Sequence, residues 1–140
     1  MVQIIAGNKG KGKTKQLLDK VNNAILTATG NIVYLDKSQK HMHELSNRVR
    51  LINVMEYPIT NPDEFIGFIC GIISQDYDLQ EMYLDSFLTI GCINTDEEIT
   101  RAIEKLDEIS EKYGVLFVLS VSRDEVDLPE YAKAKLIVSL

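Results

Sequence analysis

The sequence has no apolar run approaching the roughly 20 residues that a membrane-spanning helix needs. Its N-terminus lacks the layout of a secretory signal peptide. The chain of 140 residues contains only two cysteines, and their spacing is not that of a metal site. It has no repeat, no low-complexity tract and no linker long enough to divide it. These absences predict a single domain, residues 1–140, of a cytoplasmic protein with no membrane partner.

Over the whole chain, basic residues are fewer than acidic ones. The 15 lysines and arginines face 21 acidic residues, so the net charge is −6 at pH 7. This balance argues against nucleic acid or an anionic membrane surface as the main partner. Hydrophobic content of 45% and charged content of 26% are ordinary for a soluble globular protein. A local basic patch remains compatible with these numbers.

What the sequence does have is an alternation of short apolar segments with helical patterns. The candidate strands are Val2–Ala6, Ile32–Leu35, Leu51–Val54, Met82–Leu84, Val115–Val121 and Leu136–Val138. Amphipathic helices are expected before Gly30, after Asn61 and after Thr95, where Thr95 and Glu98 form a capping-box pattern. Apolar strands separated by helices indicate an α/β fold. We expect three layers: a mainly parallel sheet of about five strands with helices on both faces.

The stretch GNKGKGKT combines three glycines with three lysines and matches the phosphate-binding pattern G-x-x-x-x-G-K-[ST], or Walker A. It follows a predicted strand and precedes a predicted helix, which is the context that a P-loop requires. The alternative is a flexible basic surface loop. The residues expected to bind a nucleotide are Gly7, Asn8, Lys9, Gly10, Lys11, Gly12, Lys13 and Thr14. Within this set Lys13 would reach the β- and γ-phosphates, and the Thr14 hydroxyl would ligate Mg²⁺.

A second magnesium ligand is expected at the end of another strand. In QEMYLDSFLTI a short apolar segment ends at Asp85, in the form of a Walker B segment. An aspartate there would hold Mg²⁺, usually through a water molecule. Asp36, which closes NIVYLD, fits the same pattern. Only one helix separates Asp36 from the glycine loop, so Asp85 is the preferred candidate.

Together these segments resemble a pared-down RecA/KaiC-like ATPase core. The resemblance depends on the P-loop and on NIVYLDKSQKHMHEL, MYLDSF and VLFVLSVS, and it spans roughly residues 2–121. It implies that Asp36 is the catalytic acid that orients the attacking water. It also implies that Ser120 or Ser122 is a polar group near the γ-phosphate. Because Asp36 is shorter than the glutamate usual in the family, and Ser86 replaces an acid after Asp85, the expected hydrolysis is slow.

Arg123 lies just beyond the carboxyl end of a predicted strand, where ligands of parallel sheets bind. Arg123 follows VLSVS and is a candidate phosphate contact, or an arginine finger that acts on a neighbouring subunit of a homo-oligomer. Arg48 and Arg50 are expected at the surface. The predicted function is Mg²⁺-dependent ATP binding with slow hydrolysis, coupled to self-association or to an unknown protein partner. The alternatives are a non-hydrolysing nucleotide-binding regulatory module and a small nucleoside or nucleotide kinase.

Overall fold

The structure, a computed structural model of residues 1–140, contains one six-stranded sheet in which every pair of neighbouring strands is parallel. The strand order is β3-β2-β4-β5-β1-β6. The strands are β1 (Val2–Ala6), β2 (Asn31–Asp36), β3 (Arg50–Asn53), β4 (Leu79–Leu84), β5 (Leu116–Val121) and β6 (Leu136–Ser139). The predicted α/β class is confirmed.

The predicted number of about five strands is wrong: all six apolar segments form strands, including the two short ones at the edges of the sheet. Strand β3 has four residues and pairs only with β2, and β6 has four residues and pairs only with β1. An apolar segment of three or four residues gives little periodic signal by itself. Each edge strand is defined by its pairing with a longer neighbour.

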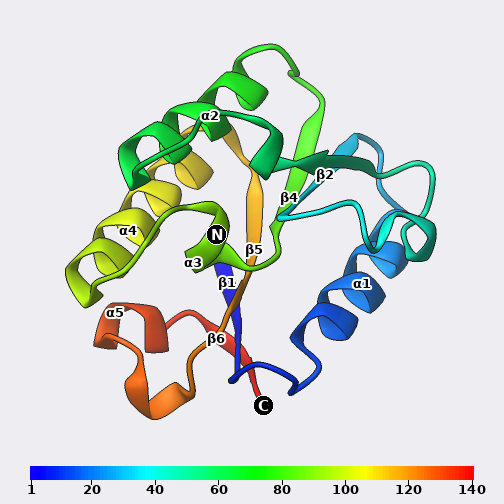
Figure 1. Cartoon of the computed structure of the whole chain (residues 1–140). Coiled ribbons are helices and arrows are strands. Elements are labelled where there is room, and N and C mark those ends of the chain that lie inside the picture. The colour runs from blue at the N-terminus through cyan, green and yellow to red at the C-terminus, as the bar shows by residue number, and fades with distance from the viewer.

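Helices cover both faces of the sheet. They are α1 (Lys13–Ala24), α2 (Pro62–Ser74), α3 (Phe87–Ile90), α4 (Asp96–Tyr113) and α5 (Glu130–Lys133). Three short 3₁₀ turns, η1 (Met42–Glu44), η2 (Val54–Glu56) and η3 (Glu125–Asp127), lie in the connections. Helix α1 lies on one side of the sheet, and α2 and α4 lie on the other (Figure 1). None of these helices has both the length and the hydropathy needed to cross a membrane.

The two layers of helices bury cores of different size. The cluster that includes α2 and α4 contains 26 buried residues, whereas the cluster that includes α1 contains 10. Neighbouring residues of one strand enter opposite cores: Ile4 belongs to the larger and Ile5 to the smaller. This alternation explains why consecutive residues such as Ile4 and Ile5 are both apolar, since both faces of the sheet are covered.

The first helix ends earlier than the sequence predicts. Helix α1 stops at Ala24, and the next residues form tighter turns, with the Thr27 N–H donating to the Ala24 carbonyl at 3.3 Å. Threonine is a weak helix former, which favours this end. Gly30, expected to end the helix, instead lies where a Cβ atom would be 2.1 Å from the Asp78 carbonyl oxygen. Its role is close approach to the segment before β4.

Candidate nucleotide-binding site

A hollow of about 360 Å³ lies at the carboxyl edge of the sheet. It is lined by Lys9, Gly10, Lys13, Thr14, Lys37, Asp85, Ser86, Leu88, Thr89, Ser120 and Ser122. These residues follow or end β1, β2, β4 and β5, whose carboxyl ends meet at this edge because the strands are parallel. Ligands of open parallel sheets bind beyond the carboxyl ends of the strands. The hollow is therefore the place where the fold favours a ligand.

The glycine loop turns sharply before α1. Gly10 and Gly12 have φ angles of 82° and 95°, which a residue with a side chain rarely adopts. Gly12 caps α1, which begins at Lys13, so the positive end of the helix dipole faces the hollow that Gly10, Lys13 and Thr14 line. Backbone N–H groups at such a helix end bind anions. The geometry thus suits a phosphate group.

The predicted loop residues divide into two groups. Lys9, Gly10, Lys13 and Thr14 line the hollow, whereas Gly7, Asn8, Lys11 and Gly12 do not. Asn8 anchors the loop, since its Nδ2 donates to Asp124 Oδ2 at 2.7 Å. Gly7 packs so closely that a Cβ atom there would lie 3.0 Å from the Leu140 Cβ. The second group contributes to the shape of the loop.

The Lys13 side chain is nearly buried, with 8% of its surface exposed, although it carries an ammonium group. Its Nζ donates to the Asn8 carbonyl at 3.2 Å, which leaves further donors for a ligand. Burial lowers the pKa of Lys13, and the negative charge of Asp85 acts in the opposite direction. The lysine and the aspartate therefore act on one another within the same hollow.

Asp85 is buried and held at both carboxylate oxygens. Ser120 Oγ donates to Oδ1 at 2.7 Å, and the Tyr34 hydroxyl donates to Oδ2 at 2.8 Å. The Ser86 N–H donates in turn to Ser120 Oγ at 2.7 Å. Each carboxylate oxygen still has a lone pair for another donor, such as a metal-bound water. No local pattern in the sequence indicates the contribution of Tyr34, which comes from a neighbouring strand.

Asp36 lies near Asp85 but is not among the residues that line the hollow. It is 3% exposed; its Oδ1 accepts the Lys37 N–H at 2.7 Å, and its Oδ2 is buried without a hydrogen-bond partner. Burial, with a further contribution from the charge of Asp85, raises the pKa of Asp36 to about 6. The predicted catalytic acid is thus a buried carboxylate with one free oxygen.

The two predicted groups after β5 lie in different surroundings. Ser122 is exposed and lines the hollow. Arg123 does not line it: its Nη1 donates to Asp96 Oδ1 at 2.5 Å and to the Asp127 carbonyl at 3.2 Å. Asp96 is the first residue of α4, so the arginine is tied to the amino end of that helix. The functional roles of Ser122 and Arg123 remain predictions.

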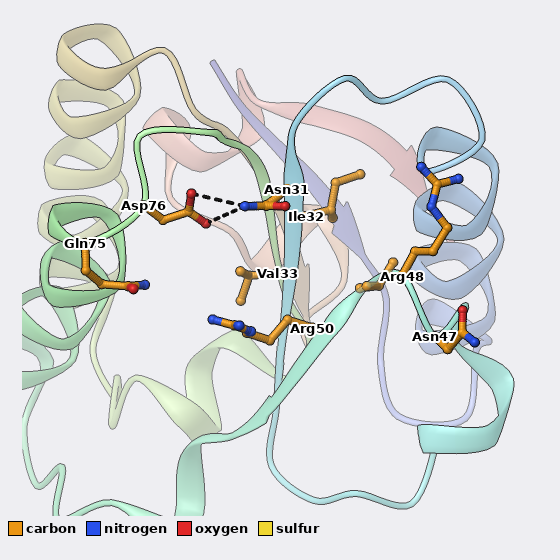
Figure 2. Close-up of a pocket in the computed structure, with 9 residues that line it drawn as sticks. Asn31, Ile32, Val33, Asn47, Arg48, Arg50, Gln75 and Asp76 are labelled. Carbon is orange, nitrogen blue, oxygen red and sulfur yellow. Dashed lines mark hydrogen bonds between the residues drawn. The ribbon is translucent and has the colours of Figure 1, made fainter.

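A larger hollow, of about 500 Å³, lies at the opposite, amino-terminal edge of the sheet (Figure 2). Arg48 and Arg50 line it and are exposed, as expected for surface arginines. The Asp76 carboxylate in this hollow accepts hydrogen bonds from the Asn31 amide at 3.0 and 3.1 Å. The two hollows share no lining residue, so Arg48 and Arg50 do not approach the glycine loop.

The protein has no group of three or more His, Cys, Asp and Glu side chains placed to hold a metal ion. A divalent cation in the hollow beside the glycine loop would therefore need other oxygens besides Asp85. The Thr14 hydroxyl, water and the ligand's own phosphates could supply them, which is how Mg²⁺ is commonly held. The residues present fit a magnesium–phosphate complex better than a metal bound by protein alone.

Comparisons with known proteins assign no family to the chain. No model of a protein family matches it, and no curated protein matches it either. The function is therefore inferred from the residues of the hollow.

Proposed function

We propose that the protein is a P-loop NTPase that binds ATP with Mg²⁺ at Gly7–Thr14 and hydrolyses it slowly. The observation that supports this most strongly is that Lys13, Thr14 and Asp85 line one hollow beside the amino end of α1. The motif G-x-x-x-x-G-K-[ST] stands between a strand and a helix, as such a site requires. The RecA/KaiC-like resemblance of the sequence belongs to the same proposal.

The residues of the hollow have separate roles in this proposal. The Lys13 ammonium neutralises and positions the phosphate chain, while backbone N–H groups of the loop bind its oxygens. The Thr14 hydroxyl and Asp85 would hold Mg²⁺, with Asp85 acting through water. When bound, Mg²⁺ offsets the negative charge that develops on the phosphates. Tyr34 and Ser120 fix the Asp85 carboxylate for this role through the hydrogen bonds described above.

The slow rate of hydrolysis in this proposal follows from the positions of Asp36 and Arg123. Orientation of the attacking water is assigned to Asp36, whose free Oδ2 can accept a hydrogen bond but which does not line the hollow. Arg123 is paired with Asp96, so it does not supply charge to its own site in this conformation. An arginine at the transition state contributes about 10³-fold or more in related enzymes. The same observations favour the second candidate, a regulatory module that binds nucleotide without hydrolysing it.

Thermal denaturation with a panel of nucleotides, with and without Mg²⁺, tests the proposal. ATP at 100 times its dissociation constant should stabilise the wild-type fold by about 2.7 kcal/mol, or several degrees in Tm. Lys13→Ala should remove most of this shift, because it deletes the buried ammonium. Lys15→Ala is the matched control: Lys15 is exposed and pairs with Asp19 at 3.1 Å outside the hollow.

An equal ATP shift in wild type and Lys13→Ala would mean that the phosphates bind elsewhere, and the proposal would be wrong. Phosphate release on the nucleotide that binds then separates the two candidates. Slow release above the background rate supports the NTPase, and release at the background rate with nucleotide bound supports the regulatory module.

A further inference from the structure

The hollow beside the glycine loop contains more positive charge than the motif requires. Lys9, Lys13 and Lys37 line it together with one carboxylate, that of Asp85. Lys13 is held by the Asn8 carbonyl. Neither Lys9 nor Lys37 has a carboxylate within 4.0 Å of its ammonium group, so no ion pair of this chain neutralises either charge. Unpaired cations that converge on one hollow favour a ligand with several negative charges.

Lys37 reaches the hollow from the side opposite the loop. It follows β2, and two strands, β4 and β5, separate β2 from β1, which is about 14 Å at the usual strand spacing. Its backbone N–H donates to Asp36 Oδ1 at 2.7 Å, so its starting point is fixed to the sheet edge. Lys37 and the glycine loop therefore approach the hollow from different sides.

Electrostatic coupling between the lysines supports this arrangement. Burial is the main cause of the lowered pKa of Lys13, and among the neighbouring cations Lys37 lowers this pKa more than Lys9 does. Lys9 is four residues from Lys13 in the sequence and Lys37 is 24 residues away. The fold thus brings Lys37 close enough to Lys13 for their charges to interact, although they are far apart in the sequence.

We propose that Lys37 contacts the terminal phosphate of a bound nucleoside triphosphate, as a cation supplied by the same chain. The proposal rests on nucleotide binding at Gly7–Thr14. Lysine is a compact charge on a flexible stem, which suits a single terminal phosphate. Arg123 is held by Asp96 and does not line the hollow, and Lys37 is the one lining cation that comes from outside the glycine loop. Lys37 should therefore increase the affinity for a nucleoside triphosphate. It should not increase the affinity for a diphosphate, which lacks the terminal phosphate.

The test is the dissociation constant for ATP and for ADP, each with Mg²⁺, in wild type and variants. Lys37→Gln should weaken ATP binding about tenfold, as expected for a lost charge-assisted hydrogen bond, and change ADP binding little. Lys37→Arg should keep the ATP preference. Lys40→Gln is the matched control, since Lys40 is exposed on the same segment and does not line the hollow; it should change neither constant.

Three outcomes would overturn the inference. An unchanged ratio of the two constants in Lys37→Gln, with ATP binding still dependent on Lys13, would contradict Lys37 alone and leave the proposed function standing. Loss of the ATP preference in Arg123→Ala but not in Lys37→Gln would assign the contact to Arg123. Absence of ATP binding in wild type would overturn both the inference and the proposed function.

Discussion

Asp36 combines almost complete burial with an oxygen that has no hydrogen-bond partner. Ionisation of a buried carboxylate costs desolvation free energy, and the like charge of Asp85 nearby adds to this cost for Asp36. The pKa of Asp36 is therefore raised from 3.8 to about 6 in the fold. The fold binds this proton more tightly than the unfolded chain does. Stability from this group is thus present below about pH 4 and is lost as the pH rises through about 6.

The substitution Asp36→Asn should abolish this loss of stability at rising pH, because asparagine stays neutral. The free energy of unfolding of the variant relative to wild type should increase between pH 4 and pH 7 by at most about 3 kcal/mol. The measurement is denaturant unfolding without nucleotide or metal at several pH values. Asp127→Asn, at an exposed carboxylate, is the control and should show no such trend. A pH-independent difference for Asp36→Asn would show that the carboxylate is not destabilised by burial.

At the scale of the elements, Gly30 determines how closely the start of β2 approaches the segment before β4. A Cβ atom at Gly30 would meet the Asp78 carbonyl oxygen at 2.1 Å and the Gln80 Cγ at 2.8 Å. A backbone oxygen cannot move away as a flexible side chain can. We expect Gly30→Ala to destabilise the protein by about 1–3 kcal/mol, the usual cost of overpacking. Thermal or denaturant unfolding measures it.

Gly67→Ala provides the opposite control. Gly67 lies inside α2, and no atom stands within 4 Å of the position of its Cβ. Alanine is a better helix former than glycine by about 0.8–1.0 kcal/mol, so this variant should be more stable than wild type. If both variants lost stability equally, the close approach at Gly30 would not be the cause.

The elements that the sequence predicts well are those with local signals. The first strand has the predicted bounds, Val2–Ala6, and α1 begins within the motif at Lys13. The capping box of α4 is also confirmed, since Thr95 accepts the Glu98 N–H and Glu98 accepts the Thr95 N–H. Each of these features depends on residues a few positions apart. Local chemistry is sufficient to predict them.

Features that depend on strand order could not be predicted in this way. The hydrogen bonds of Tyr34 and Ser120 to Asp85 join residues 51 and 35 positions apart. Whether Asp36 or Asp85 lies nearer the glycine loop is decided by the order of the strands in the sheet. The position of Lys37 directly after an apolar strand is a local pattern that could have indicated a site residue. Its proximity to Lys13, however, depends on the order of the strands in the whole sheet.

At the scale of the whole molecule, the sheet places the two acidic strand ends unequally relative to the glycine loop. Strand β5 alone separates β1 from β4, which ends before Asp85, whereas β4 and β5 both separate β1 from β2, which ends at Asp36. This order makes Asp85 the nearer carboxylate. It agrees with the choice of Asp85 over Asp36 as the proposed magnesium ligand.

The unequal cores have a consequence for local opening of the structure. Helix α1, on the side of the smaller core, buries fewer apolar side chains than α4 does, so it has less apolar surface holding it to the sheet. Backbone amides of α1 should therefore exchange with deuterium faster than those of α4 in the absence of ligand. ATP with Mg²⁺ should slow exchange most in α1, because the proposed phosphate site lies at its first turn. On this proposal, the layer that opens most easily is the one that a bound nucleotide would hold closed.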